Sequence, residues 1–492
     1  MNKRGPSIVL IMADQLTVNA LGIYGNPVVL SPQIDELGKT GIVFDKCYCP
    51  SPVCAPSRAA MMAGKLPSVI GVYDNGAEFP ASVPTFVHEL RRAGYRCVAS
   101  GKLHYVGPDQ LHGFEQRLTT DIYPAGFDWT PVSWEQGVSR NPGSSVREIL
   151  NSGTCRRSLQ IDYDEAVQYQ AVQFLYDQAR MRTAQPFFLM ISYTHPHDPF
   201  YVAEPYWNRY RDDDIGLPSI AMRSWEELHP YDRWIQYHHE ADRYPLGADQ
   251  VIKARHAYYG MVSYVDDKVG EIVQTLEQTG LRKETVILFT ADHGEMLGER
   301  GMWFKRTFYE PSARVPLIVN APGLSSERVD RNVSLLDLYP TILDLANLSA
   351  TDEMAGRSLL SRAERPVIAE YLGEGVEQPC RMLRMGPWKY VYVRQQPEQL
   401  FNLDDDPPEL VNRALDPTVK KALEQCRQHL LNSWDAERER QRIIDSQQAR
   451  LLLHRALQCG QRLAWDYQPK QDTPTAYVRG VDAQEMSRRR RM

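Results

Sequence analysis

The fold is decided by a short stretch, Ser7–Gln15, which reads SIVLIMADQ. Its six apolar residues, Ile8–Ala13, run without interruption and then meet Asp14 and Gln15. A run of this length is typical of a strand buried on both faces of a parallel sheet. It is too short for the core of a signal peptide or for a membrane-spanning helix. The stretch therefore predicts a buried strand with polar residues at its carboxyl end.

Four further apolar runs have the same form, and three of them also end in residues able to do chemistry. They are Arg96–Ser100 before Lys102 and His104, Pro186–Tyr193 before His195 and His197, Thr285–Ala291 before Asp292 and His293, and Arg314–Asn320 before an Ala-Pro-Gly turn. Helical patterns separate the runs. They span Ser31–Thr40, Thr85–Ala93, Tyr163–Arg182, Ala257–Gly280 and Leu335–Ala346.

Alternating strands and helices predict an α/β fold with a doubly wound, mostly parallel sheet covered on both faces. In such sheets ligands bind outside the carboxyl ends of the strands. Two long loop-like segments, Trp129–Leu159 and Tyr201–Gly247, are predicted to shape the mouth of a site.

The pattern changes after about residue 365. Trp388–Val393 alternates like an antiparallel strand, Leu400–Pro407 reads as a strand and turn, and Val419–Ser446 reads as one long helix. We therefore expect a catalytic α/β domain over residues 1–365 and a smaller C-terminal α+β domain of sheet plus helix over residues 366–460. The tail, residues 461–492, has no pattern of its own and is a candidate intersubunit arm.

Composition excludes several classes of partner. The chain has 492 residues, 43% of them hydrophobic, and a net charge of −6. That balance gives no electrostatic footprint for nucleic acid, and no apolar stretch is long enough to cross a membrane. The eight cysteines are irregularly spaced and do not form a disulfide framework, which favours a reducing, cytoplasmic setting.

One of these cysteines stands in an unusual context, Cys54-Ala55-Pro56-Ser57-Arg58. The run that follows, Ala59–Leu66, predicts a helix and places Cys54 at or just before its N-terminus. The positive end of a helix dipole lowers the pKa of a thiol. A lone cysteine before a helix is more often structural, so the surrounding residues decide its role.

A candidate metal site combines residues from two strand ends, which are Asp14, Gln15, Asp292 and His293. Hard oxygens with one imidazole suit a divalent cation of the calcium or magnesium kind. The structural alternative is that Asp292 and His293 cap a helix beginning at Gly294.

A set of cationic or proton-donating side chains lies next to the same strand and helix ends. Its members are Arg58, Lys102, His104, His197 and Lys305. Together they would neutralise a doubly charged oxyanion ester and stabilise charge on its leaving group. Each alone is more often a surface cation or a hydrogen-bonded core histidine.

These residues carry a resemblance to the type I sulfatases. Cys54–Arg58 matches the C-x-P-S-R motif of that family, and Gly94–His104 resembles its second signature, with Cys97 where Ser or Thr is usual. Leu400–Asn412 resembles its C-terminal N-L-x-x-D-P-x-E-x-x-N pattern. The resemblance implies an alkaline-phosphatase-like fold and metal-dependent hydrolysis of sulfate esters. It also implies that a sulfatase-maturing enzyme converts Cys54 to formylglycine.

The resemblance further implies a role for each matching residue. The metal ligands would be Asp14, Gln15, Asp292, His293 and the modified Cys54, around one calcium ion or, alternatively, magnesium or manganese. Many sulfatases have Asp where Gln15 stands. Arg58 and Lys102 would support the hydrated aldehyde and the sulfate. The remaining roles would be a hydrogen bond to the second hydroxyl for His104, a sulfate oxygen for Lys305, and leaving-group protonation or sulfate binding for His197, with His195 as the weaker alternative.

A narrower resemblance is to choline sulfatases. It is carried by Met12–Leu16, Ser51–Arg58, Val72–Pro80, Val106–Phe114 and Leu118–Pro124. It implies choline-O-sulfate or another small alkyl sulfate as substrate, a cytoplasmic location and a homo-oligomer, either a dimer or a tetramer.

A trimethylammonium group favours an aromatic face beside a carboxylate. The candidates for the face are Trp129 and Tyr123, and those for the carboxylate are Glu374 and Glu370. The resemblance fades between Val132 and Gln160.

Arginines near that stretch, Arg140, Arg156 and Arg157, would favour an anionic or sugar substrate. Three alternatives to a choline sulfatase therefore remain. They are a carbohydrate sulfatase, a phosphonate monoester or phosphodiester hydrolase with the same nucleophile, and an unmodified protein that only binds sulfate esters.

Overall fold

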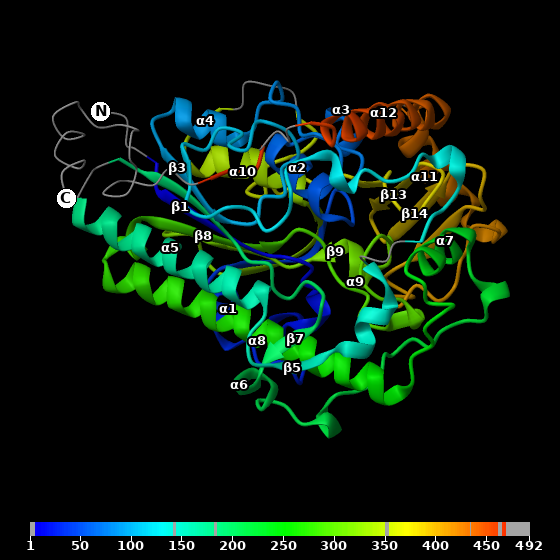
Figure 1. Cartoon of the computed structure of the whole chain (residues 1–492), viewed down its shortest axis with the longest axis horizontal. Coiled ribbons are helices and arrows are strands. Elements are labelled where there is room, and N and C mark those ends of the chain that lie inside the picture. Colours follow the sequence, from blue (N-terminus) through cyan, green and yellow to red (C-terminus); the bar gives the residue numbers. More distant parts are fainter. Residues whose placement is uncertain are drawn as a thin grey trace.

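A central sheet with helices on both faces dominates the molecule, and a smaller sheet lies at one end of it (Figure 1). The structure is a computed structural model that describes residues 5–140, 144–181, 185–349, 354–432, 434–460 and 465–468. No helix within those ranges is both long and apolar enough to cross a membrane.

The central sheet has the strand order β11-β2-β10-β8-β1-β6-β3-β4, and β9 pairs with β2 beside it. Its strands are β1 (Ser7–Ala13), β2 (Ile42–Tyr48), β3 (Arg96–Gly101), β4 (Gln116–Arg117), β6 (Phe187–Ser192), β8 (Thr285–Ala291), β9 (Arg314–Val315), β10 (Leu317–Asn320) and β11 (Glu327–Ser334). Within it β9 and β10 run antiparallel to their neighbours and the other pairs are parallel. The predicted mostly parallel sheet is confirmed.

Helices cover both faces of this sheet. One face carries α1 (Pro32–Lys39), α5 (Leu159–Met181) and α8 (Ala248–Gln278), and the other carries α2 (Cys54–Ala63), α4 (Phe86–Arg92) and α10 (Leu338–Leu345) (Figure 1). The short helices are α3 (Pro67–Ile70), α6 (Glu204–Trp207), α7 (Pro230–His238) and α9 (Glu310–Ala313). A two-stranded ladder, β5 (Gly153–Cys155) with β7 (Tyr201–Ala203), lies outside the main sheet.

Four neighbouring strands, β8, β1, β6 and β3, bring their carboxyl ends to one edge. They are parallel, and their register pairs Ala13 with Ala291, Met12 with Ser192, and Gly101 with Ser192. Every residue from Ile8 to Ala13 is fully buried. The polar residues that follow these strands therefore gather at a single place.

Besides the two-residue β4, two strands of the sheet, β2 and β11, were not predicted. In β2 the apolar run is broken by Asp45 and Lys46, and β11 reads ERVDRNVS with several exposed residues. β11 lies at the edge of the sheet, where charged side chains face water and blunt the edge. Neither sequence has the uninterrupted apolar form that identified the central strands.

The smaller sheet is antiparallel, in the order β12-β13-β14-β15. Its strands are β12 (Val367–Tyr371), β13 (Cys380–Met385), β14 (Trp388–Val393) and β15 (Gln399–Asn402). One face packs on α11 (Lys420–Leu431) through Tyr390 and Cys426, and the other joins the main core through Met382 and Val391.

The prediction of a single long helix over Val419–Ser446 is wrong. The chain forms α11 and then a separate helix, α12 (Ala436–Leu457), because Asp435 accepts hydrogen bonds from the first amides of α12 and starts it anew. α12 contacts the catalytic domain, where Arg450 makes a bidentate ion pair with Asp74 at 2.7 Å. Of the predicted tail over residues 461–492, only 465–468 lie within the described residues.

Candidate active site

Cys54 is the first residue of α2, as the sequence predicted. Every residue of this helix is buried, and Asn75 Oδ1 accepts the amide N–H of Ala55 at 3.0 Å, which satisfies one of the free donors of the first turn. Burial alone would raise the pKa of the Cys54 thiol, but the nearby charges of Lys102 and Lys305 lower it well below its ordinary value. The site is thus built to hold a negatively charged group at this position.

Cys54 belongs to a compact group of possible metal ligands. One ligand atom each from Asp14, Cys54, Asp292 and His293 lies within 4.8 Å of the others, and all four residues are buried. The strand ends predicted to converge therefore do so, and they include both carboxylates of the candidate metal site.

Each of the two carboxylates has a cationic partner. Arg58 Nε donates to Asp292 Oδ2 at 2.8 Å and, against the effect of burial, holds the pKa of Asp292 well below its usual range. Asp14 pairs with Lys102, yet burial and the charge of Asp292 raise the pKa of Asp14. Carboxylate oxygens beside an imidazole suit a divalent cation, which would offset the repulsion between the two carboxylates, so the residues present fit such an ion.

His293 presents the correct nitrogen to this group. Its Nδ1 lies 3.0 Å from the carbonyl oxygen of Gly294, which can only accept, so Nδ1 carries the proton. In the neutral imidazole Nε2 is then the free acceptor, and it lies 3.1 Å from Cys54 Sγ. This orientation by a second partner is what metal-binding histidines require.

The side chain of Gln15 is held by groups other than the two candidate carboxylates, whereas its backbone N–H donates to Asp292 Oδ1 at 3.1 Å. Its amide Nε2 donates to Asp198 Oδ1 at 3.0 Å and to Glu295 Oε2 at 2.6 Å, and its Oε1 accepts from Lys305 Nζ at 2.5 Å. Its backbone adopts a left-handed φ of 61°. Its role as a metal ligand stays a prediction, since Lys305 occupies its oxygen here.

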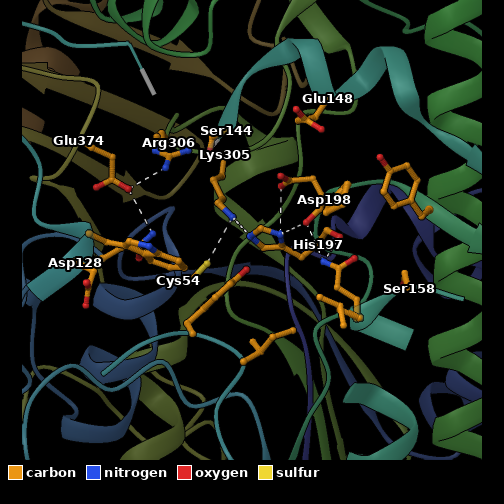
Figure 2. Close-up of a pocket in the computed structure, with 18 of the residues that line it drawn as sticks. Cys54, Asp128, Ser144, Glu148, Ser158, His197, Asp198, Lys305, Arg306 and Glu374 are labelled. Carbon is orange, nitrogen blue, oxygen red and sulfur yellow. Dashed lines mark hydrogen bonds and ion pairs between the residues drawn. The ribbon is translucent and has the colours of Figure 1, made fainter. Parts of the chain in front are cut away.

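Lys305 and His197 lie on the open side of Cys54 (Figure 2). Lys305 Nζ lies 3.5 Å from Cys54 Sγ and 2.6 Å from His197 Nε2. Burial and Lys305 lower the pKa of His197, but the carboxylates of Asp198 and Asp14 outweigh them and raise it overall. A cation and a proton donor thus flank the position of the nucleophile.

His104 approaches Cys54 from the end of β3 and is almost fully buried. Among the described residues neither ring nitrogen meets the geometry of a hydrogen bond, and burial lowers the pKa of His104 although Cys54 raises it, which favours the neutral base. Its ring lies 4.8 Å from that of Tyr123 and 5.2 Å from that of Trp129, measured between centroids. This aromatic group connects the catalytic edge to the cavity outside it.

That cavity has a volume of about 1030 Å³ and reaches Cys54. Three of the four candidates for binding the alcohol part line it, namely Tyr123, Trp129 and Glu374. Figure 2 shows Asp128 and Glu374 on one side of Cys54, and Glu148 and Ser158 on the other. Glu374 is not free, because Arg306 Nη2 donates to its Oε1 at 2.9 Å.

Several alternatives from the sequence are settled by position. His195 faces Asp164 at 2.6 Å and not the cavity, whereas His197 lines it. Glu370 binds Ser68 and Arg381 away from the cavity, which leaves Glu374 as the candidate carboxylate.

No helix begins at Gly294, so the capping alternative for Asp292 and His293 is wrong; the chain continues in turns to a short helical turn at Glu299–Gly301. Of the three candidate cations near the fading stretch, two reach the cavity and Arg156 is not among the residues that line it. Arg140 and Arg157 line the cavity and pair with Asp242 and Asp162.

Four residues that the sequence did not single out complete the site. They are Asn75, Asp198, Glu295 and Arg306. Asp198 follows His197, Arg306 follows Lys305 and Glu295 lies two residues after His293, so adjacency to a recognised site residue was the available signal for these three. Asn75 lies within Val72–Pro80, one of the stretches that carry the resemblance to choline sulfatases.

Three family models match the chain. They are "Sulfatase" over residues 6–348, "N-sulphoglucosamine sulphohydrolase, C-terminal" over residues 298–436, and "Choline sulfatase enzyme C terminal" over residues 441–491. Among curated proteins, a choline-sulfatase of Rhizobium meliloti (strain 1021) is 39% identical, with 98% of each chain covered. Arylsulfatase K of Danio rerio is 30% identical, with 83% of this chain and 80% of that protein covered.

A solved structure shares the fold. The phosphonate monoester hydrolase from Silicibacter pomeroyi superposes with a TM-score of 0.71 at 22% identity, covering 87% of this chain and 94% of that one. Because the sulfatase model spans most of the sequence and a relative that matches it along nearly its whole length is 39% identical, the chain belongs to the sulfatase family and is a sulfuric ester hydrolase.

Proposed function

We propose that the chain hydrolyses a small sulfate ester through a formylglycine made from Cys54, with choline-O-sulfate as the first candidate substrate. One observation carries the proposal. Cys54 lies within the carboxylate–histidine group on one side and 3.5 Å from Lys305 on the other. A nucleophile at that point faces a metal site and a sulfate-binding cation at once.

The chemistry needs two hydroxyls on one carbon. Formylglycine at position 54 would supply both as its hydrate, one hydroxyl for attack on sulfur and one for the release of sulfate. His197 would give a proton to the alcohol that leaves. His104 would take the proton of the second hydroxyl. A serine would lack the second hydroxyl and would retain the sulfate.

The surrounding side chains hold charge at each stage. Lys102 and Lys305 face the sulfate oxygens, and Arg58 keeps Asp292 ionised. Burial keeps His104 neutral and able to accept a proton. A divalent cation held by Asp14, Asp292 and His293, which we propose to be calcium with magnesium or manganese as alternatives, would keep the attacking hydroxyl ionised near neutral pH.

The choline assignment is supported by the relative in Rhizobium meliloti and by the wall of the cavity. Trp129 exposes 40% of its surface, and its ring lies 4.5 Å from that of Tyr123, which gives an aromatic surface for a trimethylammonium group. Against the effect of burial, Arg306 keeps the pKa of Glu374 below its usual value, so the carboxylate is charged.

The size of the cavity favours a second candidate, a carbohydrate sulfatase. Pockets of about 300–1,000 Å³ hold drug-sized ligands, and this one extends past Cys54 to Glu148 and Arg157. Choline sulfate fills only part of such a space. A phosphonate monoester or phosphodiester hydrolase uses the same nucleophile and is a further alternative for the same cavity.

Two measurements test the proposal. Mass spectrometry of the peptide containing Cys54, after co-expression with a sulfatase-maturing enzyme, is expected to show an aldehyde in place of the thiol. An active preparation whose peptide keeps the thiol would contradict the mechanism. A panel of choline-O-sulfate, an aryl sulfate, a sugar sulfate and a phosphonate monoester is expected to give the highest kcat/KM for choline-O-sulfate; a higher value for another ester transfers the assignment to that class.

Three broader expectations belong to the same proposal. The maturing enzyme is a required partner, and we propose a cytoplasmic homo-oligomer, either a dimer or a tetramer. The association is supported by Leu452 and Leu453, which expose 69% and 47% of their surface on α12. Gel filtration with light scattering measures the assembly directly.

A further inference from the structure

The C-terminal motif around Glu409 lies outside the catalytic cavity, although the sequence aligns it with a sulfatase pattern. Glu409 follows β15 in a turn, is 3% exposed, and adopts a left-handed φ of 56°. A buried carboxylate in strained backbone needs partners that repay its desolvation. Its partners are found on the catalytic domain.

Glu409 binds the start of the four-residue helix α9 (Glu310–Ala313). Its Oε2 accepts the amide N–H of Glu310 at 2.9 Å, and its Oε1 accepts from Lys389 Nζ at 2.7 Å. Lys389, on β14, is fully buried, donates to the carbonyl oxygen of Phe308 at 2.6 Å and pairs with Glu310 Oε1 at 2.7 Å. The smaller domain thus supplies one cation, Lys389, and one anion, Glu409, that fix the first residue of α9 and the segment before it.

The carbonyl groups of α9 in turn accept hydrogen bonds from the segment that follows β8 in the active site. Pro311 O accepts the N–H of Glu295 at 2.9 Å, and Ser312 O accepts that of Gly294 at 2.8 Å. These amides follow directly after Asp292 and His293. The approach is close, because a Cβ at Gly294 would come within 2.0 Å of Pro311 O.

The nucleophile side is tied to the same helix. Ala313 O accepts the N–H of Cys49 at 2.9 Å, on the segment that leads from β2 to Cys54. The segment that leads into α9 includes Arg306, whose N–H donates to Pro52 O at 3.0 Å just before Cys54. α9 therefore contacts both halves of the candidate metal site.

We infer that Glu409 and Lys389 are positioning residues, which fix α9 and through it the separation of Asp292 and His293 from Cys54. They touch neither substrate nor metal. Through these contacts the smaller domain helps to set the geometry of the metal site. The inference rests on the metal site of the proposed function.

The test replaces Glu409 with Gln, which keeps the shape and the acceptor for Glu310 N–H but removes the charge that holds Lys389. Calcium binding to chelator-stripped protein is measured by calorimetry, together with kcat, KM and the melting temperature of the metal-free protein. We expect calcium affinity to fall about tenfold and kcat to fall while KM for the ester changes little.

The matched control is Glu398→Gln. Glu398 is also in the smaller domain and also forms an ion pair, with Arg427, but it does not contact α9. A folded Glu409→Gln protein with the calcium affinity and kcat of the wild type overturns the inference, whatever its melting temperature. If Glu409→Gln does not fold, the second variant is Lys389→Arg, which keeps the charge but displaces α9. It is expected to lose calcium affinity to the same extent. Unchanged calcium affinity in Lys389→Arg would also overturn the inference. A wild-type protein that binds no divalent cation would instead contradict the proposed metal site.

Discussion

At the scale of single residues, Asp121 organises more of the site than its place in a loop suggests. Its Oδ2 accepts the amide N–H groups of Leu103 and His104 at 2.9 Å each, and Arg117 Nη2 donates to the same oxygen at 2.6 Å. Its Oδ1 accepts the N–H of Tyr123 at 3.3 Å. One carboxylate therefore holds both the base of the proposed mechanism and an aromatic wall of the cavity.

The same contacts predict a pH dependence for Asp121→Asn. Burial would raise the pKa of Asp121, but Arg117 and the amides lower it to about 2, below its ordinary 3.8. A lowered pKa means that the charged form stabilises the fold above about pH 4 and that this stability is lost as the pH falls toward 2. At pH 7 the substitution is expected to cost about 2 kcal/mol, and at pH 3 clearly less.

Urea unfolding at the two pH values measures this difference. Asp162→Asn serves as control, because its ion pair with Arg157 is exposed and is expected to contribute about 0.5 kcal/mol. An equal loss for Asp121→Asn at pH 7 and pH 3 would show that its charge is not what stabilises the loop.

Gln15 illustrates a second effect at this scale. Its amide group lies between Asp198 and Glu295, and it donates to both. Burial raises the pKa of Glu295 to about 7, so this carboxyl group is already costly to ionise. An aspartate at position 15 would add a third carboxylate and would have no N–H to donate. The amide of Gln15 instead donates to the two carboxylates already present, those of Asp198 and Glu295. The departure from the usual sulfatase residue is therefore matched by its neighbours.

At the scale of elements, the strand ends depend on close backbone contact. Gly101 closes β3 with φ of 108°, and a Cβ there would lie 2.0 Å from Ser192 O on β6. Gly101→Ala is expected to cost about 3 kcal/mol or more of folding stability and to displace Lys102 and His104. Denaturant unfolding and kcat measure the two effects.

Gly94→Ala is the matched control for that substitution. Gly94 also has a positive φ, of 91°, but nothing lies within 4 Å of its added Cβ. Its cost is therefore the backbone term alone, about 1–2 kcal/mol. If both alanine variants lose the same stability, the contact between β3 and β6 is not the determining factor.

Most of the fold followed from elements that carry their signal locally. β1, β3, β6 and β8 are continuous apolar runs, and their parallel arrangement places Asp14, Lys102 and Asp292 together without further information. β2 and β11 carry polar residues and are strands because of their neighbours, so sequence alone does not reveal them. The break between α11 and α12 was missed because helical periodicity continues across it.

The site divides in the same way. Its chemical residues follow strands and could be predicted, whereas Asp121 and Glu409 act through contacts with segments far away in the sequence. Arg306 differs again, because its partner Glu374 lies in the smaller domain's first loop and no local pattern joins them. Such pairs are defined only by the folded arrangement.

At the scale of the whole molecule, the C-terminal segment returns to the catalytic domain. Asp466 Oδ1 accepts the amide N–H of Ala125 at 2.8 Å, and the rings of Trp465 and Phe127 are 5.4 Å apart. Tyr467 lies beside Arg117, with 5.4 Å between the guanidinium carbon and the ring centroid. These contacts fall on the loop that carries Tyr123 and Trp129.

Removing the contacts is expected to weaken substrate binding more than chemistry. In the double variant Trp465→Ala with Asp466→Ala, the loop loses two anchors, so we expect KM to rise about tenfold, the equivalent of about 1.4 kcal/mol, with a smaller change in kcat. Steady-state kinetics on the best ester of the panel measure both. Leu453→Ala, on the exposed side of α12, is the control, and an unchanged KM in the double variant would contradict a role for this segment in binding.

The sheet edge described above has a consequence for how such enzymes diversify. Apart from Lys305, the groups proposed to act on sulfate follow β1, β3, β6 and β8 or lie in α2, and these elements form the buried centre of the protein. The candidate groups for the alcohol, Tyr123, Trp129 and Glu374, lie on loops, which tolerate replacement. The residues that act on sulfate and the residues that contact the alcohol thus lie in separate parts of one chain. Substitutions in the loops can therefore change which alcohol is accepted while the chemistry of sulfate cleavage is kept.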